Sequence, residues 1–349
     1  MTGGDGVPVI DPSRAHPARI YDYWLGGKDN FAADREAGEL ALRAYPELAQ
    51  AIRSNRAFLG RAVRFLAGEG IRQFLDIGTG LPASDNTHEV AQREAPDSRV
   101  VYVDNDPTVL LHAQVMLDSS PEGACDYMQA DLRDPGAILA RAAQTIDFGQ
   151  PVALMLLAVL QFILDEQEPY GLVSELVAAL PSGSYLVISH PTDDFNPNKG
   201  ESMKVYNERS AERALVRDQA ATARFFEGLD LVEPGVVPVA RWRPESDLVA
   251  ARPSSMWCGV ARKPLGVGRG QAGGSAGGHC ETGRGNRDGE KARAHFGKRQ
   301  VFTINPNTHS PYRPCEQVNT RSPSLPKCAR RWRSPRPRRA ATGPRELRK

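Results

Sequence analysis

The chain has 349 residues, of which 40% are hydrophobic and 25% charged, which is enough apolar content for one large domain or two. Its net charge of +2 hides a division, because residues 1–263 carry 25 basic and 37 acidic side chains whereas residues 264–349 carry 19 and 5. The total charge therefore gives no support to nucleic-acid binding, and the longest apolar run, residues 152–164, is too short to span a bilayer.

The N-terminal residues 1–12 are polar and acidic and contain no hydrophobic signal-peptide region. The five cysteines include no CxxC pair and have no histidine at metal-ligand spacing. We therefore expect a cytoplasmic protein with a disordered N-terminus, no disulfide framework and no metal site.

Residues 13–70 carry the apolar spacing of helices, and we expect them to form a helical lid. The first helix should stop at Gly26-Gly27. The predicted helices cover residues 18–25, 32–44 and 46–67. In the third of them, four apolar residues fall near helical spacing and predict a buried stripe: Ile52, Leu59, Val63 and Leu66.

From residue 71 the apolar pattern alternates between short strands and longer helices. Strands are predicted at 74–77, 99–103, 125–129, 152–157 and 185–189, and helices at 83–94, 108–117, 135–143 and 166–180. A long helix at 202–227 and short strands at 229–232 and 255–260 follow. This alternation predicts an α/β fold over residues 71–263: a mostly parallel, doubly wound sheet of about seven strands with helices on both faces.

The periodic pattern ends near residue 264. The remaining residues, 264–349, are rich in Gly, Arg, Pro and Ser, with few aliphatic side chains, so we expect a disordered basic tail. Such a tail can bind nucleic acid by neutralising phosphates. The abrupt change of composition is also what an out-of-frame reading of GC-rich DNA gives, and the sequence leaves both interpretations open.

The segment 74–83, FLDIGTGLPA, organises the predicted sheet. An apolar strand ends in a carboxylate, two glycines make a tight turn, and Pro82 suits the first turn of a helix. Doubly wound folds hold nucleotide-like ligands at such a strand–turn–helix junction.

Three carboxylates follow three successive strands: Asp76, Asp104 and Asp131. One aspartate at a strand end is ordinary, but three at one edge of the sheet, beside two glycines, predict a ligand site. The glycines and Ala83 also fit a dinucleotide-binding motif. However, Asp76 and Asp106 would repel a pyrophosphate, whereas S-adenosylmethionine is cationic, has no phosphate and suits carboxylates.

These motifs resemble those of the Rossmann-like class I methyltransferases: DIGTG at 76–80, VDND at 103–106 and QADL at 129–132. Together with IYDYWLGGKDNF at 20–31, DIGTGLP at 76–82 and DLRDP at 131–135, they resemble more narrowly an actinobacterial family of S-adenosylmethionine-dependent methyltransferases with no assigned substrate. The resemblance covers residues 12–263 and excludes the tail.

The resemblance implies a role for each matching residue. The methionine moiety would face Asp76, Gly78 and Gly80. The ribose would be held by Asp104, with Asn105 beside it, and the adenine framed by Asp131 and Leu132. The lid would contribute three further contacts to the cofactor: Tyr21, Tyr23 and Asn30.

Two candidates for the chemistry follow the fourth and fifth strands. At Gln161 the resemblance leads us to expect His; a glutamine can orient a substrate but cannot take a proton at neutral pH. His190 lies at the edge where a base belongs, although a strand-end histidine bonded to a loop carbonyl is an equally simple interpretation.

We therefore predict an S-adenosylmethionine-dependent methyltransferase with a small-molecule acceptor, no membrane association, and nucleic-acid contact only through the tail. Two alternatives stay open. The same turn could serve an NAD(P)-dependent oxidoreductase, or the protein could be a regulator that binds S-adenosylmethionine without transferring its methyl group.

Overall fold

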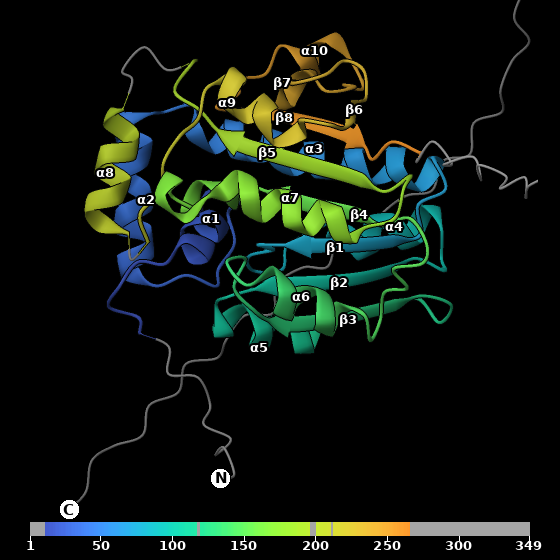
Figure 1. Cartoon of the computed structure of the whole chain (residues 1–349). Helices are drawn as coiled ribbons and strands as arrows, with labels where there is room; N and C mark the ends of the chain where they lie inside the picture. The colour runs from blue at the N-terminus through green and yellow to red at the C-terminus, as the bar shows by residue number, and fades with distance from the viewer. Residues whose placement is uncertain (1–10, 117–118, 196–199, 211, 266–349) are drawn as a thin grey trace, which may run out of the picture. The chain divides into compact units, whose positions relative to one another are not determined.

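A single mixed sheet runs through the part of the chain that the computed structural model describes, which comprises residues 11–116, 119–195, 200–210 and 212–265. Its strand order is β3-β2-β1-β4-β5-β8-β6, and β7 also pairs with β8 (Figure 1). The strands are β1 (Gln73–Ile77), β2 (Arg99–Asp104), β3 (Ala124–Gln129), β4 (Ala153–Leu157), β5 (Tyr185–Pro191), β6 (Asp230–Leu231), β7 (Val237–Pro238) and β8 (Met256–Arg262).

The first five strands are parallel, and β8 lies antiparallel to β5. This arrangement confirms the predicted mostly parallel, doubly wound sheet, with eight strands in place of about seven. The strand order reverses between β1 and β4, and parallel α/β sheets open a crevice at the carboxyl ends of strands at such a point.

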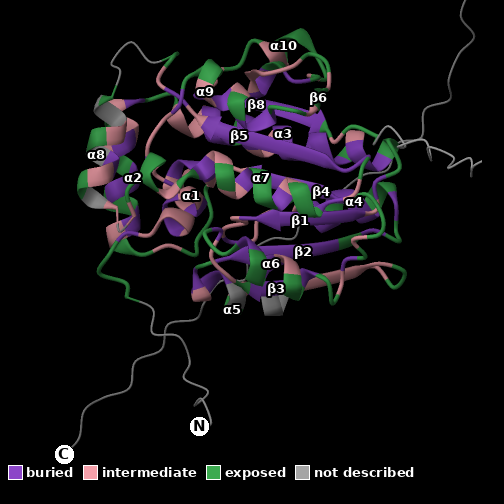
Figure 2. Cartoon of the chain, viewed as in Figure 1, coloured by how far each residue is buried: buried purple, intermediate pink, exposed green. Residues whose placement is uncertain are grey.

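Helices cover both faces of the sheet, and the central strands are mostly buried, whereas β3 is partly exposed and β6 is exposed (Figure 2). The helices are α1 (Pro17–Leu25), α2 (Ala32–Ala44), α3 (Leu48–Gly68), α4 (Thr87–Glu94), α5 (Pro107–Met116), α6 (Pro135–Ala142), α7 (Pro169–Ala179), α8 (Glu201–Arg209), α9 (Gln219–Ala223) and α10 (Asp247–Ala250). Short 3₁₀ turns occupy Leu160–Phe162, Asp165–Gln167, Arg224–Phe226 and Val239–Arg241.

Alternate residues of each strand enter different cores, as the period of two in a strand requires. In β1, Phe74 joins the core under α3 and α4, whereas Leu75 joins the core under α6 and α7. The apolar stripe predicted for the third helix is confirmed, because all four of its residues are buried in the first of these cores. Thus α3 is a layer of the sandwich, while α1, α2 and α8 lie side by side near the strand ends (Figure 1).

The helix predicted at 83–94 begins later, at Thr87, so the prediction that Pro82 opens a helix was wrong. Asn86 is the N-cap residue, and its backbone N–H donates to the Glu89 carboxylate at 2.8 Å. The Asn86 side chain instead accepts from the Ala83 N–H, which holds residues 83–86 in a loop. The glycine turn is therefore followed by a short loop before the helix.

The prediction of a single helix over residues 202–227 was also wrong, because α8 ends at Arg209 and α9 starts at Gln219. Backbone groups between them bond to distant parts of the fold: Leu215 N–H donates to the Gln161 carbonyl, and Arg217 N–H to that of Pro191. These tertiary partners replace the local partners that a continuous helix would provide.

None of the described helices is long and apolar enough to cross a bilayer. Residues 1–10 of the N-terminus predicted to be disordered (1–12) and residues 266–349 of the predicted tail (264–349) lie outside the described residues.

Candidate functional site

A cavity of about 240 Å³ opens at the carboxyl ends of β1, β2 and β4, beside the point where the strand order reverses. Its walls come from α1, α2 and α3, from the loops after the strands, and from Pro191, Thr192, Asp193, Met203, Tyr206, Glu212, Ala214, Val216, Ser255 and Met256. Eight of the ten predicted cofactor residues line it together with Gln161: Tyr21, Asp76, Gly78, Gly80, Asp104, Asn105, Asp131 and Leu132. The other two, Tyr23 and Asn30, do not line it.

The glycine turn forms the floor of the cavity between β1 and α4. Gly78 has φ +77° and Gly80 has φ +63°, the left-handed region that favours glycine. At Gly78 a side chain would also collide with Val159, whose Cγ2 lies 2.3 Å from the position of an added Cβ. The sequence therefore places glycine where both the turn and the contact with the loop after β4 need it.

Asp76, on β1, lines the cavity and is buried, with 5% of the residue exposed. Its Oδ2 accepts a hydrogen bond from the Thr87 hydroxyl at 2.6 Å. Burial raises the pKa of Asp76 to about 6, and the Thr87 bond offsets only part of that rise. A cation placed beside Asp76 would favour its ionised form.

Asp104 is fixed by backbone amides at the end of β2. Its Oδ2 accepts from the Gly80 N–H at 2.8 Å and its Oδ1 from the Asp106 N–H at 3.0 Å. Burial raises the pKa of the Asp104 carboxyl, and these amides partly counteract it. The carboxylate thus ties the glycine turn to β2 and presents its remaining lone pairs to the cavity.

Asp131 and Leu132 follow β3. Asp104 is the last residue of β2, which lies between β3 and β1 in the sheet. The Asp131 carboxylate pairs with Arg133 at 2.9 Å and is half-buried, and Leu132 is buried. The order Asp76, Asp104, Asp131 along the cavity follows the strand order β1, β2, β3, as the sequence predicted for one edge of the sheet.

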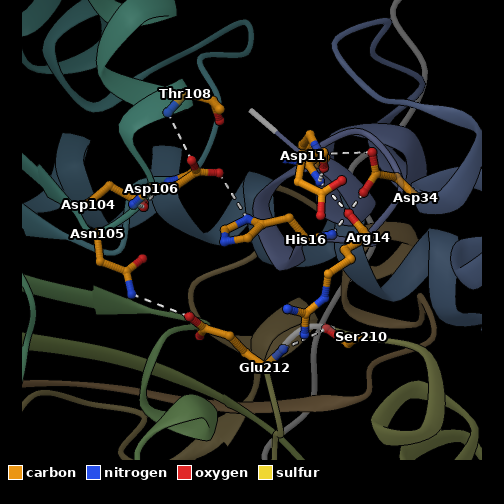
Figure 3. A network of polar contacts seen from close by, with 12 residues as sticks. Asp11, Arg14, His16, Asp34, Asp104, Asn105, Asp106, Thr108, Ser210 and Glu212 are labelled. Atoms are coloured by element: carbon orange, nitrogen blue, oxygen red, sulfur yellow. Dashed lines mark hydrogen bonds and ion pairs between the residues drawn. The ribbon is translucent and has the colours of Figure 1, made fainter. Parts of the chain in front are cut away.

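His16, which the sequence analysis did not single out, approaches the site from the N-terminal side of α1. Its Nδ1 lies 3.0 Å from Asp106 Oδ2, and Asp106 also accepts from the Thr108 N–H (Figure 3). Burial by itself would raise the pKa of Asp106, but His16 and Thr108 together lower it to about 2. The contact joins α1 to the loop that carries Asp104.

A second buried carboxylate anchors the same segment. Asp34, on α2, accepts hydrogen bonds from the His16 N–H, the Phe31 N–H and the Arg19 guanidinium, at 2.8 to 2.9 Å. It is fully buried, so the pair with Arg19 is enclosed by protein. Asp34 therefore fixes the position from which His16 reaches Asp106.

The three predicted lid residues have different surroundings. Tyr21 lines the cavity, and its hydroxyl accepts a hydrogen bond from the Asn55 side-chain amide at 3.0 Å. Tyr23 donates to Glu39 on α2, and Asn30 donates to Asp22 on α1. Neither Tyr23 nor Asn30 is among the lining residues, so their observed contacts join parts of the N-terminal region to one another.

The two candidates for the chemistry also differ. Gln161 lines the cavity in the turn after β4, whereas His190 is fully buried and is not among the lining residues. The His190 Nδ1 lies 2.9 Å from the Pro191 carbonyl and its Nε2 lies 2.8 Å from Arg217 Nη1. Burial, with the nearby Arg217 charge, lowers the pKa of His190 to about 3, which gives a neutral ring whose Nε2 accepts from Arg217.

Asp76 predicts a pH dependence for cofactor binding. The affinity for S-adenosylmethionine should fall about tenfold between pH 7 and pH 5, because the protonated carboxyl attracts no cation. The unliganded protein should instead become more stable as pH falls from about 6 towards 4, where the native state binds the extra proton. Calorimetric titration and urea unfolding across this range measure the two effects.

Asp76→Asn is the control for that experiment and should reduce both dependences on pH, leaving the part of the stability effect that comes from Asp104, whose pKa is also raised by burial. An affinity that stays constant from pH 5 to pH 7 in the unaltered protein would contradict the assignment of Asp76 to the cationic end of the cofactor.

The sheet order, the glycine turn and the carboxylates at the ends of β1 to β3 define a class I, Rossmann-like methyltransferase. The chain belongs to the S-adenosyl methyltransferase family, which residues 5–264 match. Its fold, its S-adenosylmethionine cofactor and its class of enzyme, as inferred from the sequence, are thereby confirmed.

Two solved structures are similar to it. A DUF574 family protein from Streptomyces avermitilis is 48% identical over 73% of this chain and 99% of that chain, with a TM-score of 0.70. A candidate methyltransferase from Thermobifida fusca is 41% identical over 72% of this chain and 96% of that chain, with a TM-score of 0.67. A comparison with the curated proteins finds no match.

Proposed function

We propose that the cavity binds S-adenosylmethionine across the ends of β1, β2 and β3 and receives a small-molecule methyl acceptor beside β4. The observation that carries the proposal is the single cavity that joins Asp76, the glycine turn and Asp104 to Gln161. In the strand order, β4 lies on the opposite side of β1 from β2 and β3. Cofactor and acceptor would therefore meet above the end of β1.

The charges around the cavity support a cationic cofactor. Five carboxylates line it, at Asp76, Asp104, Asp131, Asp193 and Glu212, against two guanidinium groups, at Arg56 and Arg133. Arg133 is paired with Asp131, and Arg56 bonds to the loop at Ser84 and Asn86. The residues present thus fit a sulfonium and an ammonium, and they would oppose a pyrophosphate.

Each protein group has a definite task in this proposal. Bound S-adenosylmethionine supplies a methyl group activated by its sulfonium charge. Asp104 would accept from both ribose hydroxyls, Asp131 from the adenine amino group, and the glycine turn would let the backbone approach the methionine moiety closely. The protein thereby aligns two reactants and excludes water, which supplies most of what a displacement at carbon requires.

The acceptor side of the cavity supports a small molecule. It is covered by α2 and α8, through Ala41, Met203 and Tyr206, so the methyl group would be transferred inside an enclosed space. A polymer would need an open groove at the same place. A cytoplasmic location stays a prediction of the sequence.

The family and the cavity charges disfavour the two alternatives. An NAD(P)-dependent oxidoreductase would place a pyrophosphate beside Asp76 and Asp104, which are both acidic and buried. A regulator without activity would fit a site in which Gln161 cannot take a proton. However, an acceptor with a free lone pair does not require a base at Gln161.

Calorimetric titration with S-adenosylmethionine and with NADPH tests the proposal. We expect saturable binding of S-adenosylmethionine and its demethylated product, and no heat from NADPH. Formation of S-adenosylhomocysteine in the presence of a library of small acceptors then reports turnover. Tight binding of NADPH, or turnover only with protein or nucleic-acid acceptors, would refute the proposal.

A further inference from the structure

The amide of Gln161 has a fixed orientation inside the cavity. Its Nε2 donates to the Ala158 carbonyl at 2.6 Å. A carbonyl can only accept, so the group facing it must be the NH₂, and the oxygen is turned the other way. Gln161 Oε1 is buried and has no hydrogen-bond partner among the described residues, although the residue lines the cavity.

Arg217 holds the turn that carries Gln161. Its guanidinium donates to the Leu160 and Ile163 carbonyls, each at 3.1 Å, on either side of Gln161. The same group bonds to His190 and pairs with Asp165 at 2.7 Å. Arg217 is 5% exposed, so this support lies beneath the cavity floor, and it makes Arg217 and His190 positioning residues for Gln161.

Apolar side chains contribute to the surroundings of Gln161, and Arg133 donates to the neighbouring Phe162 carbonyl at 3.2 Å. The Leu215 N–H donates to the Gln161 carbonyl and thereby brings Ala214 and Val216 beside it. Phe162 lies next in the turn and packs with Met203 and Tyr206. A ligand here would bury an apolar body and offer one hydrogen-bond donor to Oε1, because an unpaired buried oxygen is costly.

In the proposed function Asp76, Asp104 and Asp131 serve the cofactor, and each carboxylate that lines the cavity also accepts a hydrogen bond from the protein. The pairs are Asp76 with Thr87, Asp104 with Gly80, Asp131 with Arg133, Asp193 with Gly200 and Glu212 with Asn105. His16 is paired with Asp106. Gln161 itself cannot accept a proton at neutral pH. The acceptor must therefore carry a nucleophilic lone pair without being deprotonated in the site.

We propose that the methyl acceptor is an uncharged aromatic amine whose N–H donates to Gln161 Oε1, an inference that rests on the proposed function. The nitrogen lone pair forms the N–C bond as the S–C bond breaks, and the electron pair of that bond passes to sulfur. The product ammonium then loses its proton to water. A phenol would need a base at Gln161, and a carboxylate would be repelled by the five lining carboxylates.

Three probes on one scaffold separate these acceptors: 6-aminoquinoline, 6-hydroxyquinoline and quinoline-6-carboxylate. With the full chain and S-adenosylmethionine, we expect mass spectrometry to show methylation of the amine at least about tenfold faster than of the other two. Calorimetry with the protein saturated in S-adenosylhomocysteine should show the amine binding about tenfold more weakly to Gln161→Leu than to the unaltered protein. Binding of S-adenosylhomocysteine itself should not change.

Gln144→Leu is the matched control, since Gln144 is exposed and does not line the cavity. It should bind the amine normally. Gln161→His should make 6-hydroxyquinoline a substrate by supplying a base. Equal or faster methylation of the hydroxyl or carboxylate probe, no binding of any probe to a protein that binds S-adenosylhomocysteine, or equal losses in both leucine variants would overturn the inference. Failure to bind S-adenosylmethionine would instead refute the proposed function.

Discussion

Replacing Asp104 with alanine is expected to weaken S-adenosylmethionine binding about 100-fold or more. Two hydrogen bonds from ribose hydroxyls to a buried carboxylate contribute roughly 1.5 to 3 kcal/mol each, and the substitution removes both. It also leaves the Gly80 and Asp106 amides without their present acceptor, which loosens the glycine turn. Calorimetric titration of the purified variant measures the loss.

Two further variants give this prediction its controls. Asp104→Asn keeps the volume and one acceptor oxygen, so it should lose less affinity and less stability than the alanine variant, although one of the Gly80 and Asp106 amides would lose its acceptor. Asp147→Ala removes a carboxylate that only bonds to its own loop, at Gly149 and Gln150, and should bind S-adenosylmethionine normally. Unchanged affinity in both Asp104 variants would mean that the ribose is held elsewhere.

Gly78→Ala is expected to destabilise the protein by about 3 kcal/mol. Alanine at positive φ costs about 1 to 2 kcal/mol, and its Cβ would lie 2.3 Å from Val159 Cγ2, so the loop after β4 must move. Urea unfolding measures the change in the free energy of unfolding. The displaced loop leads to Gln161, so turnover should fall as well.

Gly80→Ala is the matched control, because Gly80 also has positive φ but faces open space. It should cost only about 1 to 2 kcal/mol. Combining Gly78→Ala with Val159→Ala should recover part of the loss by removing the clashing methyl groups. If the two glycine variants are equally destabilised, contact with Val159 does not explain the glycine at position 78.

Local patterns were sufficient for the architecture. The change from helical to alternating periodicity near residue 71 predicted the parallel sheet, and the strand ends predicted that Asp76, Asp104 and Asp131 would share one edge. The predicted ends of helices were less accurate where side chains form hydrogen bonds with residues outside the helix. The start of α4 at Thr87 depends on the loop contacts of Asn86, which the apolar period does not contain.

The finer arrangement of the site depends on contacts between residues far apart in the chain. His16 meets Asp106, and Arg217 reaches back 57 positions to Leu160. Each of these residues resembles an ordinary surface residue in the sequence. A histidine just before a proline-led helix and an arginine within a predicted helix give no signal of a buried partner, because the partner is chosen by how the elements pack.

Strand periodicity, glycine turns and strand-end carboxylates are local features, so the amino-acid sequence was enough to predict the class of fold, the family and the sheet edge at which we propose the cofactor binds. The tertiary structure was needed to show that His190 is a buried support for Arg217 and that Gln161, which lines the cavity, has a buried Oε1 without a hydrogen-bond partner among the described residues. Those roles follow from burial and from which groups remain unpaired after packing, and neither property is defined until distant segments meet.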